Sequence, residues 1–185
     1  MNKRSVFAVA VALMFGFSAL HASAQKDPMV GGAAMYPTKN IVENAVNSKD
    51  HTTLVAAVKA AGLVDTLESP GPFTVFAPTN EAFDKLPAGT VDTLLKSENL
   101  AQLKKILTYH VVAGKLTAKD IDKQIKAGGG KATLTTVEGG TLTAMMQGSK
   151  LVLTDEKGGT ATVTIANVFQ SNGVIHVVDT VLMPK

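Results

Sequence analysis

The residues best suited to chemistry in this chain are an adjacent tyrosine and histidine, Tyr109 and His110. A histidine titrates near neutral pH and a tyrosine carries a hydroxyl group, so the pair could exchange protons or hydrogen bonds with a ligand. The pair lies in the segment Thr108–Val112, where a predicted helix runs into a predicted strand among apolar residues. A buried histidine that hydrogen-bonds to loop backbone would fix such a junction, and we expect this structural role for His110.

Two other histidines follow the N-terminal region, and both are expected to be structural. His51 is expected to begin a helix and to be exposed to solvent, whereas His176 lies in an apolar run, Val174–Val178, and is expected in the core. Asp179 follows this run and is expected to anchor backbone N–H groups. The spacing of these histidines and His110 fits no local metal-ligand motif, so we predict no metal site and no cofactor.

Enzymatic activity is not expected. The chain has no cysteine, which excludes thiol catalysis, disulfides, cysteine-ligated zinc and iron–sulfur clusters. There is no G-x-S-x-G motif around a serine nucleophile. The glycine run Gly128–Gly130 is not followed by the Lys-Ser/Thr pair that a phosphate-binding loop requires, and it is interpreted as a loop.

The N-terminus has the composition of an export signal. Lys3 and Arg4 precede an apolar stretch over residues 6–20, and Ala22-Ser23-Ala24 is typical of a cleavage site. We therefore predict a signal peptide over residues 1–24 and a protein that is exported to the periplasm or the extracellular medium.

The rest of the chain is predicted to contain a flexible leader, residues 25–37, and one domain, residues 38–185. Removal of Lys3 and Arg4 lowers the 18 basic residues to 16 against 15 acidic ones, a net charge of +1. This small charge and the lack of a basic block argue against nucleic-acid binding. No hydrophobic tail precedes Lys185, so we expect no membrane insertion after signal cleavage. The protein is also expected to be a monomer.

The order of the predicted elements favours an α+β fold with early helices packed on a predominantly antiparallel sheet or wedge. Helical periodicity dominates before residue 130, and strands separated by turn residues follow. Asn172-Gly173 is interpreted as a hairpin turn in which glycine supplies a positive φ. The predicted strands are Lys131–Val137, Thr141–Gln147, Lys150–Thr154, Thr160–Phe169 and Val174–Met183.

Three segments, taken together, resemble a known family. They are Gly71–Phe83 (GPFTVFAPTNEAF), Thr108–Val112 (TYHVV) and Asn172–Pro184 (NGVIHVVDTVLMP). In this order and spacing they resemble the fasciclin-like (FAS1) domain over roughly residues 38–184. The residues that match its structural motifs are Phe73, Ala77, Pro78, Thr79, Asn80, Phe83, Asn172, Gly173, His176 and Asp179.

The resemblance implies a secreted interaction module that mediates adhesion by binding a protein or polysaccharide of a cell surface or matrix. In animal relatives, a tyrosine-histidine motif and an Asp-Ile pair are implicated in integrin contact. Tyr109 and His110 match the first motif. Asn167 and Val168 replace the Asp-Ile pair, so a carboxylate–metal contact with an integrin is not expected there. These four residues are the candidate binding residues.

A periplasmic small-molecule or lipid-binding protein is the alternative function. It requires a pocket between the helices and the sheet, open near His110 and lined by phenylalanines such as Phe73, Phe76, Phe83 or Phe169. The apolar content of 45% with only 5% aromatic residues favours it, because few rings are available to fill space.

A methionine pair offers one further surface hypothesis. Met145 and Met146 lie on a predicted strand, so one of them faces outward. An outward methionine beside Leu142 or Leu151 could belong to a groove for a partner, although ordinary core packing with one exposed methionine is the simpler interpretation.

Overall fold

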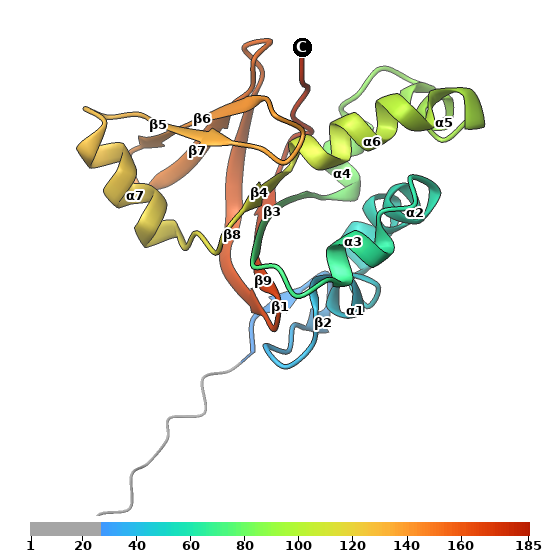
Figure 1. The fold of residues 1–185 in the computed structure, drawn as a ribbon, viewed down its shortest axis with the longest axis horizontal. Coiled ribbons are helices and arrows are strands. Elements are labelled where there is room, and N and C mark those ends of the chain that lie inside the picture. The colour runs from blue at the N-terminus through green and yellow to red at the C-terminus, as the bar shows by residue number, and fades with distance from the viewer. Residues whose placement is uncertain (1–26) are drawn as a thin grey trace, which may run out of the picture.

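The computed structural model describes residues 27–185 and forms an α+β fold (Figure 1). The predicted signal peptide, residues 1–24, lies outside the described residues. The helices are α1 (Ile41–Ala45), α2 (Thr52–Ala60), α3 (Val64–Glu68), α4 (Asn80–Asp84), α5 (Thr90–Leu94), α6 (Leu100–Tyr109) and α7 (Ala118–Ala127), with short 3₁₀ turns at Lys49–His51 and Ser97–Asn99. The strands are β1 (Met29–Val30), β2 (Ala33–Ala34), β3 (Phe73–Pro78), β4 (Val111–Ala113), β5 (Ala132–Thr135), β6 (Thr141–Gln147), β7 (Lys150–Thr154), β8 (Thr160–Gln170) and β9 (Gly173–Val178).

Seven strands form one sheet in the order β4-β3-β9-β8-β7-β6-β5. Only the β3–β9 pair is parallel, and the other neighbours are antiparallel, which confirms the predicted α+β class. Strands β6 and β7 have the predicted bounds, whereas β9 ends at Val178 and not at Met183. Irregular register between β8 and β9, near Ile165, bends the long strand β8.

The sheet separates two hydrophobic cores. Figure 1 shows α1 to α6 on one side and α7 on the other. Alternate residues of β9 face alternate sides, so Ile175 and Val177 pack with α1–α6 while Val178 packs with α7, β5, β6 and β7. Every residue of β9 is buried for this reason, which explains why its sequence is almost continuously apolar.

The prediction of a flexible leader over residues 25–37 is wrong for residues 29–35. These residues form the β1–β2 hairpin, closed by Gly31 and Gly32 with positive φ, and Val30 and Met35 are buried in the larger core. Buried Asn44 of α1 fixes the hairpin, because its side chain bonds the backbone N–H and carbonyl of Tyr36. The glycines that suggested flexibility therefore form a specific turn.

Candidate functional site

The tyrosine-histidine pair lies where α6 meets β4, as predicted, and both side chains are buried. The Nδ1 atom of His110 is 2.8 Å from the carbonyl oxygen of Ile106, and its Nε2 atom accepts a hydrogen bond from the N–H of Leu182 at 3.0 Å. Because Nε2 accepts, the proton of the neutral ring is on Nδ1 and is donated to Ile106. Burial lowers the pKa of His110 to about 4, so the ring is neutral at pH 7.

Tyr109 is held just as firmly on the other side of the sheet. Its hydroxyl donates to the carbonyl of Thr141 at 2.6 Å and accepts from the N–H of Glu156 at 3.2 Å. Burial raises the pKa of Tyr109 to about 12. A proton-transfer role for this hydroxyl at neutral pH is therefore disfavoured, and the pair joins α6 to β6 and to the C-terminal segment.

The structural role of His110 leads to a first prediction. The His110→Ala variant is expected to lose about 1–3 kcal/mol of unfolding free energy, because Leu182 N–H loses its buried acceptor and a cavity forms. Urea unfolding at pH 7 measures the loss, with Lys104→Ala on the exposed face of α6 as the control. A His110→Ala variant as stable as this control would show that the two hydrogen bonds do not stabilise the fold.

The remaining candidate binding residues, Asn167 and Val168, lie on β8. Asn167 adopts a positive φ of 60°, and its side-chain oxygen accepts a hydrogen bond from Ala118 N–H at the start of α7. Val168 is fully buried. Because Tyr109, His110 and Val168 are all buried, they cannot touch a macromolecular partner directly in this conformation, and only Asn167 is partly accessible.

His176 and Asp179 occupy the structural positions that the sequence suggested. The Nε2 atom of His176 is 2.8 Å from the carbonyl oxygen of Leu116, and its ring stacks on Phe76 with centroids 5.6 Å apart. Burial lowers the pKa of His176. The carboxylate of Asp179 accepts a hydrogen bond from Thr162 N–H, which ties the end of β9 to β8.

The motif that begins at Phe73 builds strand β3 and the start of α4. Thr79 caps α4 by accepting a hydrogen bond from Ala82 N–H, and Asn80 accepts from Thr53 N–H in α2. The other motif residues, Phe73, Ala77, Pro78 and Phe83, are buried or partly buried around this turn.

Asn172 connects three distant segments of the chain. Its side chain accepts from Ile41 N–H and donates to the carbonyls of Leu67 and Ser69. These bonds join the β8–β9 turn to α1 and to the end of α3. A buried amide with three backbone partners is fully accounted for by this structural role.

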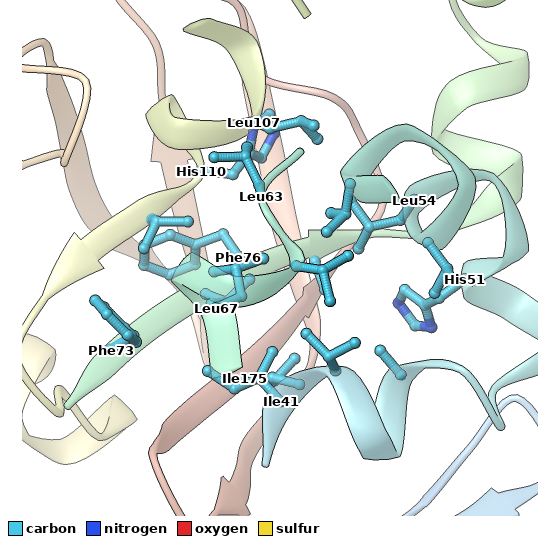
Figure 2. Close-up of a pocket in the computed structure, with 18 of the residues that line it drawn as sticks. Ile41, His51, Leu54, Leu63, Leu67, Phe73, Phe76, Leu107, His110 and Ile175 are labelled. Atoms are coloured by element: carbon cyan, nitrogen blue, oxygen red, sulfur yellow. The ribbon is translucent and has the colours of Figure 1, made fainter. Parts of the chain in front are cut away.

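An apolar pocket lies between helices α1, α2 and α3 and strands β3 and β9 (Figure 2). Its volume is about 70 Å³, and its wall includes Phe73, Phe76 and His110 but neither Phe83 nor Phe169. A pocket therefore lies near His110 with two of the four expected phenylalanines, but its volume is well below that of ordinary ligand pockets, so the alternative function stays a prediction.

His51 also lines this pocket, and its predicted exposure to solvent is wrong. The side chain is only 3% exposed, because the Lys49–His51 turn packs the ring under α1 and α2. Its Nδ1 atom is 2.8 Å from the hydroxyl of Ser48. Burial lowers the pKa of His51. A histidine at a helix start carries no local sequence signal for such burial, which depends on the hairpin and on β3.

A second hollow is an open groove between α7 and strands β6, β7 and β8, with a volume of about 550 Å³. Met146, which is 38% exposed, and Leu151 give it an apolar floor. Asp122, Ser149 and Thr164 add charged and hydroxyl groups to its wall. Met146 lies beside Leu151, as the register shows, but on the same face of β6 as the buried Leu142 and Ala144. It is therefore the inward-facing methionine, exposed at the end of the strand, and a partner groove at an outward methionine stays a prediction.

This arrangement of helices and sheet matches a known family. A family model described as the fasciclin domain matches residues 49–184, which is most of the chain. The chain belongs to the fasciclin-domain family.

Relatives of this fasciclin domain occur in several bacteria. Protein sll1483 of Synechocystis sp. is 48% identical over 160 residues, which are 86% of this chain and 82% of the relative. The cell surface glycolipoprotein MPB83 of Mycobacterium bovis is 35% identical over 86% of this chain and 61% of its own length. A solved FAS1 domain pair from the insect cell adhesion molecule Fasciclin I has the same fold, with a TM-score of 0.69 and 20% identity over 78% of this chain and 51% of that protein.

Two observations on residues 27–185 of the fasciclin domain concern metal binding and membrane crossing. No group of three or more histidine, aspartate or glutamate side chains within residues 27–185 could hold a metal ion. No helix in that part of the chain has the length and hydropathy needed to cross a bilayer.

Proposed function

We propose that this fasciclin domain is an exported, non-enzymatic interaction module that attaches to a protein of a cell surface or matrix. Family membership supports the proposal, since one relative is named as a cell surface glycolipoprotein and the solved domain pair comes from a cell adhesion molecule. The signal-like N-terminal sequence supports export to the periplasm or beyond.

The observation that carries the proposal is the open groove beside α7. Its apolar floor of Met146 and Leu151 with a polar rim has the composition of an interaction surface. The methionine side chain adapts to partners of different shape. No aromatic ring lines the groove on which a sugar could stack, so a protein segment is favoured over a polysaccharide.

Binding without turnover is consistent with the placement of the reactive side chains. The histidines within residues 27–185 are His51, His110 and His176, and all three are buried. None of them is presented at the surface to a substrate. The tyrosine-histidine corner then serves to hold the domain rigid and not to contact the partner.

The groove leads to a second prediction. The Met146→Glu variant is expected to lose at least about tenfold in affinity for intact cells, because a charge is placed on the apolar floor. Met146 is exposed at 38%, so the variant should keep its stability. Retention of the purified chain on cells at several concentrations measures the affinity.

Met29→Glu is the matched control, because Met29 is a methionine exposed at 59% on β1 and lies outside the groove. Protease treatment of the cells should abolish binding, whereas loss on periodate treatment alone would indicate a polysaccharide partner. Equal binding by the Met146→Glu and Met29→Glu variants would exclude the groove as the contact surface.

A further inference from the structure

The Nε2 atom of His51 stands out among the buried polar groups. Within residues 27–185, it is the one buried side-chain nitrogen or oxygen without a hydrogen-bond partner. A buried polar group without a partner is costly, and native structures rarely leave one unexplained. The carbonyl of Ala77 lies near enough to act on the pKa of the ring but forms no hydrogen bond of acceptable geometry with it.

The hydrogen bond at the other ring nitrogen decides what His51 can offer. The hydroxyl of Ser48 has Nδ1 of His51 as its hydrogen-bond partner, so we assign the hydroxyl proton to that bond. Nδ1 is then the acceptor, and the ring proton is on Nε2. Because burial lowers the pKa of His51, the ring stays neutral at pH 7 and presents a single N–H donor.

The pocket that contains this donor is otherwise apolar and small. Most of its 26 lining residues are apolar, and its volume of about 70 Å³ is too small for a bulky ring system. Figure 2 shows His51 and Phe73 on opposite sides of it, with Leu54, Leu67 and Ile41 between them. A water molecule needs two to four polar partners, and this wall supplies few beyond Nε2.

The rim of the pocket is accessible from solvent. Lys59, Thr66 and Val137 line it and are exposed, in contrast to His51. The exposed lining residues of α2 and α3, Lys59 and Thr66, mark the side from which a molecule would enter.

We propose that this pocket binds a slender, unbranched alkyl chain whose neutral oxygen, as an alcohol or an ester carbonyl, accepts a hydrogen bond from Nε2 of His51. The chain replaces empty apolar space with van der Waals contacts along Leu54 and Leu67. The oxygen supplies the missing acceptor. A carboxylate fits less well, because a neutral ring in an apolar wall does not compensate a buried charge.

The test uses 1-octanol and methyl octanoate as probes, with the protein labelled with ¹⁵N. Both probes are expected to bind and to shift the Nε2 resonance of His51, while octanoate at pH 7.5 binds more weakly. The His51→Leu variant should weaken octanol binding about 2- to 12-fold, the range of one neutral hydrogen bond. Val55→Phe, which fills the pocket from α2, should abolish binding, and Ala56→Phe on the exposed side of the same helix is its control.

The shift of Nε2 in the unmodified protein decides the proposal even if a variant fails to fold. An unchanged Nε2 resonance at millimolar octanol would overturn it. Octanol binding that is the same in the Val55→Phe and Ala56→Phe variants would also overturn it, because the chain would then lie elsewhere.

Discussion

The Gly173→Val variant is expected to lose more than about 4 kcal/mol of unfolding free energy and to be largely unfolded at 25 °C. Gly173 begins β9 and lies opposite Phe73 in the parallel β3–β9 pair. A Cβ atom at this position would be 2.1 Å from the backbone oxygen of Phe73 and 3.0 Å from its carbonyl carbon. Backbone atoms of a central strand cannot move aside, so the two strands would have to separate. Circular dichroism and urea unfolding measure the effect.

Gly62→Ala is the control for Gly173→Val. Gly62 has a positive φ of 65° after α2, and open space surrounds its missing Cβ. Replacing Gly62 by alanine should lower the unfolding free energy by only about 1–2 kcal/mol, because alanine is strained at a positive φ. If the Gly173→Val and Gly62→Ala variants melt at similar temperatures, the close approach of β3 and β9 does not restrict position 173.

The importance of Gly173 could be predicted from the sequence, but the reason for it could not. Asn172-Gly173 indicates a hairpin turn, and a turn is present, formed by Ser171 and Asn172 between β8 and β9. The φ of Gly173 is not positive. What requires glycine is the backbone of Phe73, which is a hundred residues earlier in the chain, and no local pattern indicates that contact.

The same distinction applies to the rest of the fold. Strands β6 and β7 were predictable to the residue because alternating apolar residues and glycine turns are local signals. The hairpin at residues 29–35 was not, because its order depends on Asn44 and on burial of Met35 against distant elements. Folding likewise places His51 in a pocket and Met146 in a groove, which single-residue patterns do not show.

Acidification is expected to destabilise the domain in a window set by its buried histidines. In the unfolded chain His110 takes up a proton near pH 6.5, whereas burial lowers its pKa to about 4 in the folded state. The hydrogen bond to Ile106 and the charge of Asp155 counter this shift only in part. Between these two pH values the unfolded state binds more protons, so the unfolding free energy decreases as the pH falls.

The loss should be complete near pH 4 and amount to about 3 kcal/mol from His110 alone, at 1.36 kcal/mol for each pKa unit. The pKa values of His51 and His176 are also lowered by burial, so both histidines add to the loss in the same direction below pH 6.5. Urea unfolding at pH 7.5, 6.0 and 4.5 measures the sum. The ring resonances of His110 should not titrate above pH 5.

Carboxylates titrate in a lower pH range than histidines, so an aspartate provides the control for the acid destabilisation. Hydrogen bonds from Thr117 lower the pKa of Asp120, so its stabilising contribution is present above its unfolded pKa, 3.8, and is lost only below it. Asp120→Asn should therefore leave the decrease between pH 6.5 and 5 unchanged. An unfolding free energy that is constant from pH 7.5 to 4.5 would mean that the histidines take up protons at the same pH in the folded and unfolded states. The hydrogen bond from Leu182 N–H to His110 would then be lost without cost below about pH 6.5, because a protonated ring has no acceptor, and its stabilising role would be excluded.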